Sequence, residues 1–118
     1  MAAENFDICV IGAGSGGLSV GYAASHMGMK VAMIEAHKMG GDCLNFGCVP
    51  SKALLAAGHA AQGMRDAGRF GIAPVEPQVD FAAVNAHVHG VIATIEPHDS
   101  AARYEGFGLD VIKAHSRF

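Results

Sequence analysis

The chain has 118 residues, of which 51% are hydrophobic and 16% are charged, and its formal net charge is −3. This length allows one domain at most. The small negative charge offers no basic surface for nucleic acid or an anionic membrane, and no apolar stretch approaches the roughly 20 residues that a membrane-spanning helix needs. Residues 1–5 lack the basic start of a signal peptide, so we expect a cytoplasmic protein.

The chain opens with an expected strand and glycine pattern. Residues 6–11 form a short apolar run typical of a buried parallel strand. The run ends at a GxGxxG pattern, in which Gly12 allows a tight turn, Gly14 lets the backbone approach a pyrophosphate, and Gly17 lets the next helix pack closely. We expect that helix over 15–28, with the phosphates at its N-terminus.

A second strand is expected over 30–35, and it ends in a carboxylate. Glu35 lies close to the separation of about 20 residues at which an acidic side chain meets the ribose hydroxyls of a dinucleotide. Strand, glycines, helix, strand and acid occur in this order. The pattern predicts a βαβ unit that binds an adenine dinucleotide.

Two cysteines follow, with four residues between them. Cys43 and Cys48 form a candidate redox-active disulfide at the expected start of a helix, where backbone N–H groups and the helix dipole favour the thiolate of Cys48. Lys52, one turn further, places a cation on the same face. Three cysteines in a reducing compartment favour catalysis over a structural disulfide.

The remainder of the chain is predicted as a helix over 50–68, a loop over 71–79, a helix over 81–95 and a strand over 109–113. Pro50 suits the first turn of a helix, and Asp80 is a plausible N-cap. Pro97 kinks or restarts the second helix toward Tyr104. The first helix has an apolar face made of Ala53, Leu54, Ala57, Ala60, Ala61 and Met64.

Several sulfur-containing residues have simpler interpretations. Cys9 lies in the first strand and is expected to be a small buried hydrophobe, and the methionines Met27, Met29 and Met33 are expected to fill the core. A zinc site built from Cys43, Cys48 and His37 is an alternative to the disulfide. Because the gap between the cysteines is wide for metal binding and no second Cys/His pair follows, we expect no metal site.

Residues 35–55, which include the two cysteines and Val49-Pro50-Ser51-Lys52, resemble the signature of the pyridine nucleotide–disulfide oxidoreductases. These FAD flavoproteins include dihydrolipoamide dehydrogenase, mercuric reductase and glutathione reductase. The resemblance runs over essentially all 118 residues. It implies an α/β fold, with a Rossmann-like FAD-binding βαβ unit on a parallel sheet, followed by a redox-active helix and a helical excursion.

The resemblance also implies roles for individual residues. Cys43 would be the interchange thiol that meets the substrate, Cys48 the thiol that faces the flavin, and Lys52 a cation beside the flavin's reactive edge. The residues that would hold FAD are Gly12, Gly14, Ser15, Gly17, Glu35, Ala36, Gly40, Gly41, Asp42, Lys52, Ala114 and His115.

The implied activity passes electrons between NAD(P)H, FAD and the Cys43–Cys48 disulfide to a thiol, disulfide or metal-ion substrate. Leu44 and Ser51 resemble the branch of dihydrolipoamide dehydrogenase and mercuric reductase more than glutathione reductase. Asp42, where Thr is common, and residues 97–106 favour a mercuric-reductase-like member.

Family members are several times longer than this chain. We therefore expect residues 1–118 to be the N-terminal part of the FAD-binding domain, inactive alone, with the NAD(P) and dimerisation domains of a homodimer lying outside it. The alternative, from a different class, is a catalytically silent dinucleotide-binding or interaction module. Its unfinished sheet would expose a strand edge and apolar faces.

Overall fold

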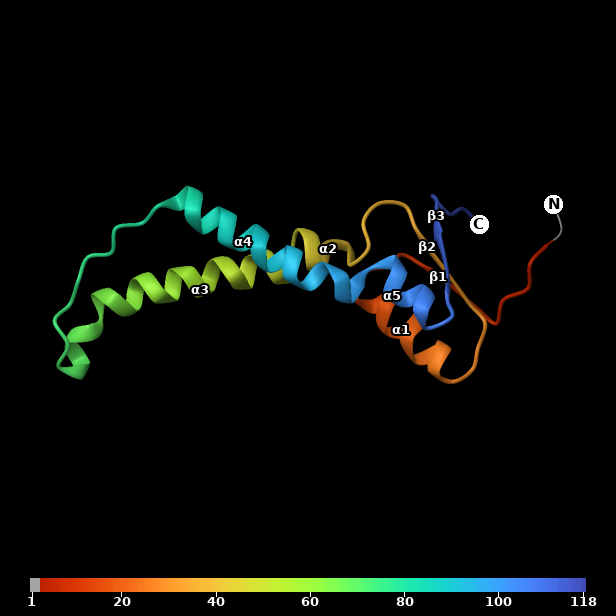
Figure 1. The fold of residues 1–118 in the computed structure, drawn as a ribbon, viewed down its shortest axis with the longest axis horizontal. Helices are drawn as coiled ribbons and strands as arrows, with labels where there is room; N and C mark the ends of the chain where they lie inside the picture. The colour runs from red at the N-terminus through yellow and green to blue at the C-terminus, as the bar shows by residue number, and fades with distance from the viewer. Residues whose placement is uncertain (1–2) are drawn as a thin grey trace.

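A computed structural model describes residues 3–118, which form a small parallel sheet with helices on one face and a long helical hairpin that projects from it (Figure 1). The described chain is elongated, with extents of 70 × 27 × 23 Å, because the hairpin extends far beyond the sheet. No helix within residues 3–118 is both long and apolar enough to cross a membrane.

The sheet has three parallel strands in the order β1-β2-β3. They are β1 (Ile8–Ile11), β2 (Val31–Glu35) and β3 (Asp110–Lys113). Each begins one or two residues later than the sequence predicts, so the prediction of three strands and a parallel sheet is confirmed with shorter bounds. Register places Val10, Met33 and Val111 side by side on one face.

That face carries the hydrophobic core. The helices α1 (Ser15–His26) and α5 (Ala101–Gly106) lie together beside it (Figure 1). Leu18 of α1 and Tyr104 of α5 pack with Val10 and Met33 in one cluster, and Met33 is completely buried. Removing a side chain of that size from water contributes about 1.5–3 kcal/mol. One shared core thus holds α1 and α5 against the sheet.

The opposite face of the sheet is partly open. Ile11, Ile34 and Ile112 lie in one row across the three strands, and the outer two are 50% and 40% exposed. Alternation of side chains along β1 puts Cys9 on the same side as Ile11.

Three of the predictions for buried sulfur residues are wrong. Cys9 is exposed, because β1 is an edge strand whose outer face carries no helix within the described residues. Met27 and Met29 are also exposed, since they lie in the turn after α1 rather than over the sheet. Of the three methionines, Met33 alone belongs to the core.

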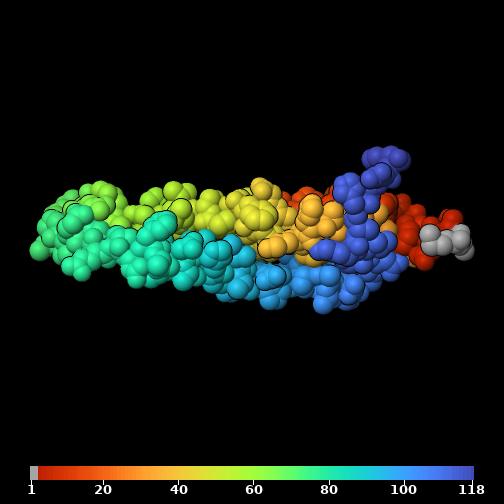
Figure 2. Space-filling view, turned by 90° about the horizontal axis from the view of Figure 1, so that it is seen from above, coloured from red at the N-terminus to blue at the C-terminus, as the bar shows by residue number. Residues whose placement is uncertain are grey.

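The helical hairpin consists of α3 (Cys48–Arg65), a 3-10 turn η1 (Ala67–Phe70), an extended segment and α4 (Phe81–Ile95). Figure 2 shows the two helices packed along each other. At the tip, Arg65 and Glu76 form an ion pair at 2.7 Å. Both predicted helices are confirmed, and Asp80 caps α4 by accepting a hydrogen bond from the Ala83 N–H at 3.1 Å.

The apolar face predicted for α3 is mostly uncovered. Ala53 is buried, whereas Leu54 and Met64 remain 46% and 43% exposed. The reason is that α4 lies beside only the first part of α3, and the extended segment that faces the rest leaves a groove (Figure 1).

The chain returns to the sheet through a break at Pro97. The 3-10 turn η2 (Glu96–Asp99) interrupts the helical path, and the Ser100 hydroxyl then caps α5 by accepting from the Arg103 N–H at 3.3 Å. The predicted kink or restart is therefore confirmed. A short helix, α2 (Gly41–Asn45), precedes α3 and is not predicted from the sequence.

Candidate functional site

The glycine loop, residues 12–17, joins β1 to α1 at the carboxyl edge of the sheet. Gly12 has φ of 95°, which favours glycine, and its N–H donates to the Ile34 carbonyl at 2.8 Å. A Cβ at Gly17 would overlap the Gly12 carbonyl oxygen, so α1 can start this close to β1 only with glycine there. No side chain within residues 3–118 caps α1, which leaves its first N–H groups for an anion.

Glu35 ties the end of β2 to this loop. Its Oε2 accepts a hydrogen bond from the Ala13 N–H and its Oε1 accepts one from the His37 N–H, both at 2.7 Å. Burial acts to raise the pKa of Glu35, but these two hydrogen bonds, with the nearby charges of His37 and Lys113, outweigh it and lower the pKa overall. An ionised carboxylate therefore faces the glycine loop at neutral pH.

The segment before the cysteines is bound directly to the same loop. Gly40, with φ of 85°, donates its N–H to the Ala13 carbonyl at 2.8 Å and bridges to Gly14. A Cβ at Gly41 would lie 2.7 Å from the Gly14 Cα, which is closer than real contacts allow. These glycines bring two distant parts of the chain into backbone contact.

The two cysteines follow at once. Cys43 lies in α2 and is half-buried, Cys48 begins α3 and is exposed, and no disulfide joins any of the three cysteines of the described chain. A hydrogen bond with the Cys48 thiol raises the pKa of Cys43, and the Cys48 backbone N–H and the charge of Lys52 only partly oppose that increase. The thiols are thus direct neighbours, with a cation nearby.

The predicted cofactor residues line two adjacent hollows at the carboxyl edge of the sheet. One, of about 230 Å³, lies between Glu35 and the start of α2, and the other, of about 330 Å³, lies beside the end of β3. Ala114, which donates its N–H to the Glu35 carbonyl at 3.1 Å, borders the second. Predicted residues that line them are Gly12, Glu35, Ala36, Gly41, Asp42, Ala114 and His115.

The other predicted residues lie nearby. Gly14 and Gly40 form the backbone bridge just described, and Ser15 is the exposed first residue of α1. Lys52 is exposed on α3, one turn beyond Cys48. The predicted site residues therefore lie in the glycine loop, in residues 35–52 and just after the end of β3.

Sequence reasoning missed several features of this region. Lys38 and Phe46 also line the smaller hollow, and Asn45 donates from Nδ2 to the carbonyls of Met39 and Gly41 at 3.2 and 2.8 Å. No local pattern marks these contacts, because each depends on the turn that the two glycines allow.

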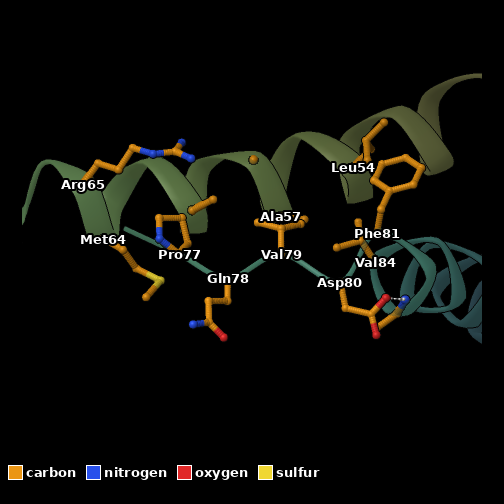
Figure 3. A pocket seen from close by; sticks show the side chains of 13 residues that line it. Leu54, Ala57, Met64, Arg65, Pro77, Gln78, Val79, Asp80, Phe81 and Val84 are labelled. Atoms are coloured by element: carbon orange, nitrogen blue, oxygen red, sulfur yellow. Dashed lines mark hydrogen bonds between the residues drawn. The ribbon is translucent and has the colours of Figure 1, made fainter. Parts of the chain in front are cut away.

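A larger apolar groove lies away from the cysteines. It measures about 540 Å³ and separates α3 from the segment that leads into α4 (Figure 3). Leu54, Ala57 and Phe81 line it together with Met64 and Val79. The apolar face of α3 was the sequence signal for this surface, although the sequence could not show that it stays open.

The alternative zinc site is not formed. Within residues 3–118, no three His, Cys, Asp or Glu side chains are grouped so that they could hold a metal ion, so His37 does not join Cys43 and Cys48.

The family model described as pyridine nucleotide-disulphide oxidoreductase matches residues 6–108. A mercuric reductase of Streptomyces lividans is 46% identical over 84 residues, which are 70% of this chain and 18% of that protein. A dihydrolipoyl dehydrogenase of Bacillus subtilis is 37% identical over 112 residues, 95% of this chain and 24% of that protein. The chain thus spans about a fifth to a quarter of these relatives.

A solved structure shows the same fold. The Cu(II) complex of the HOCl-induced flavoprotein disulfide reductase RclA of Escherichia coli matches with a TM-score of 0.74 and 23% identity, over 98% of this chain and 23% of that one. Fold and sequence agree, and the chain belongs to the pyridine nucleotide-disulphide oxidoreductase family.

Proposed function

We propose that this chain is the FAD-binding and dithiol-bearing part of a flavoprotein oxidoreductase. The observation that carries the proposal is the backbone bridge between Gly14 and Gly40. It fixes the start of the Cys43–Cys48 segment against the glycine loop, so that a dinucleotide held by the loop would end beside the thiols.

The residues present fit FAD. The uncapped first turn of α1 suits a pyrophosphate, and the absence of a Cβ at Gly41 lets the segment before the cysteines pack directly on the glycine loop. Each carboxylate oxygen of Glu35 accepts one backbone hydrogen bond and retains a lone pair for a ribose hydroxyl. We assign the adenine side to Ala36, Ala114 and His115. When bound, FAD supplies a carrier of two electrons.

The chain's own chemistry lies in the two thiols. Closing the Cys43–Cys48 disulfide forms one S–S bond and releases two electrons and two protons, and opening it takes them back. We assign Cys43 to the substrate side and Cys48 to the flavin side. Lys52 stabilises the thiolate through its charge, in the direction in which it already acts on Cys43.

For the substrate, we propose the mercuric-reductase-like branch. The support is Asp42, where Thr is common, and the sequence of residues 97–106, together with the 46% identity over 84 residues with the Streptomyces lividans mercuric reductase. We assign NAD(P)H binding and homodimerisation to the longer protein. We also assign the protein to the cytoplasm, where the reducing environment keeps cysteine thiols free.

The test is FAD binding followed by thiol counting. The chain is refolded with FAD, freed of excess flavin, oxidised at its cysteines and photoreduced without oxygen. We expect flavin absorbance to remain with the protein, and two protein thiols to appear for each reduced flavin that becomes reoxidised. Cys43→Ser and Cys48→Ser should each abolish this transfer, whereas Cys9→Ser, the matched control, should retain it. If FAD stays bound but no protein thiols appear, the proposed electron transfer from flavin to the disulfide is contradicted.

A second candidate is a silent interaction module. The row of Ile11, Ile34 and Ile112 on the open sheet face favours it, because exposed apolar rows of this kind are typical of docking surfaces. A colourless protein that binds no FAD under the same conditions would support this candidate over the first.

A further inference from the structure

We infer that Gly47 is a positioning residue that sets the approach of the two thiols. It lies immediately before Cys48, and Asp42 lies immediately before Cys43. The Gly47 N–H donates to the Asp42 carbonyl at 2.6 Å, and the Phe46 N–H donates to the same oxygen at 2.9 Å. We call this pair of hydrogen bonds the Asp42 clasp.

The Asp42 clasp closes the loop that separates the cysteines. Because the residues before each cysteine are hydrogen-bonded to each other, Cys43 and Cys48 must leave the clasp side by side. The Gly47 carbonyl in turn accepts from the Ser51 N–H at 3.0 Å, the first hydrogen bond of α3. Gly47 thus links the end of the α2 turn directly to the helix that presents Cys48.

A side chain at this point would be crowded. A Cβ at Gly47 would lie 3.0 Å from Oδ2 of Asp42 and 3.1 Å from its carbonyl oxygen. The carboxylate can rotate away, but the carbonyl is the acceptor of Gly47's own hydrogen bond. An added methyl group therefore lengthens the clasp and moves the two cysteines apart.

Separation of the cysteines has a measurable chemical consequence. A dithiol forms its disulfide in proportion to the effective concentration of one thiol at the other, and the allowed Cβ···Cβ range is narrow, about 3.5–4.5 Å. The relevant reaction passes two electrons and two protons from Cys43 and Cys48 to glutathione disulfide, which gives one protein S–S bond and two molecules of glutathione. Its equilibrium constant reports the approach of the thiols without any flavin.

The test measures this equilibrium constant for the 118-residue chain and two variants, with Cys9→Ser in every background. We expect Gly47→Ala to lower the constant about tenfold, which corresponds to about 30 mV for this two-electron couple. Gly63→Ala is the matched control, because it adds the same methyl to α3 where nothing lies within 4 Å. It should stay within about twofold of the parent.

A second variant covers the case in which Gly47→Ala does not fold. Replacement of the Gly47 amide by an ester removes the N–H donor and adds no side chain. It should lower the constant in the same direction. Equilibrium constants within about twofold of the parent for both Gly47→Ala and the Gly47 ester would overturn the inference. So would an equal fall of the constant in Gly63→Ala. The inference rests on the proposed function only for its use in catalysis, and failure to bind FAD leaves this result unaffected.

Discussion

The backbone N–H of Ala13 donates to Oε2 of Glu35 over 2.7 Å, and this hydrogen bond joins residues 22 positions apart. It connects the glycine loop, which follows β1, to the end of β2. Because Oε1 accepts from His37 at the same time, one carboxylate satisfies two backbone groups at the edge of the sheet. The candidate cofactor site is therefore held by the same residue that is proposed to contact the ribose.

Glu35→Gln should destabilise the fold. The side-chain amide of glutamine has one acceptor oxygen, and its nitrogen can only donate, so one of the two backbone N–H groups loses its partner. Such a loss costs about 1–3 kcal/mol. Urea denaturation followed by circular dichroism measures the free energy of unfolding. Glu105→Gln, on the exposed side of α5, is the matched control and should change little. Equal stability of Glu35→Gln and the parent would show that the hydrogen bonds contribute nothing.

The same carboxylate predicts a pH dependence. The pKa of Glu35 is lowered in the folded chain from an ordinary value near 4.5, so its contribution to stability is complete above that value. The contribution is lost as the pH falls below 4.5 and passes through the folded pKa. We expect the stability difference between the parent and Glu35→Gln to shrink over this acidic range, as measured by denaturation at several pH values. A stability difference that grows as the pH falls would contradict the lowered pKa of Glu35.

Gly17→Ala should disrupt the start of α1. The added methyl would overlap the backbone carbonyl of Gly12, which cannot rotate away as a side chain would, so we expect a loss of about 1–3 kcal/mol or more. In Gly16→Ala the methyl meets no atom within 4 Å, and this neighbouring variant should be neutral or slightly stabilising. Thermal unfolding of the two variants side by side measures the contrast, and similar midpoints would refute the steric explanation.

Asp80→Ala should weaken the start of α4. The variant removes the side-chain acceptor of the Ala83 N–H, and such a loss costs about 0.5–2 kcal/mol. Asp80→Asn retains an oxygen acceptor and should behave like the parent. Hydrogen exchange of the first α4 amides locates the effect. If both variants lose protection equally, the negative charge rather than the cap stabilises the helix.

Cys48→Ala should make Cys43 more reactive. The hydrogen bond with the Cys48 thiol is the largest cause that raises the pKa of Cys43, and alanine removes it while keeping the backbone N–H that lowers the pKa. More thiolate is then present at mildly alkaline pH, and alkylation of Cys43 by iodoacetamide should accelerate. Alkylation of Cys9, exposed on β1, serves as the internal reference. If alkylation slows at Cys43 and not at Cys9, the Cys48 thiol lowers the pKa of Cys43 rather than raising it.

Much of this protein could be predicted from local patterns. The spacing of Gly12, Gly14 and Gly17 predicted the turn between β1 and α1, because the positive φ of Gly12 and the contact of Gly17 with the Gly12 carbonyl are local needs. Pro97 and Asp80 likewise marked a helix break and a helix cap through backbone chemistry that acts locally. The spacing of the cysteines marked the segment that is proposed to be reactive.

The tertiary structure alone decided which surfaces are covered and which backbones meet. Cys9 and the apolar face of α3 read as core in sequence, yet both are largely exposed, because burial depends on partners that pack from elsewhere. The contact of Gly14 with Gly41 and the clasp between Asp42 and Gly47 likewise follow from the path of the chain. The sequence by itself determined which residues form the proposed dithiol segment and the proposed nucleotide loop. Folding determined that the two segments touch, because the contact between Gly14 and Gly41 depends on the path of the chain between them.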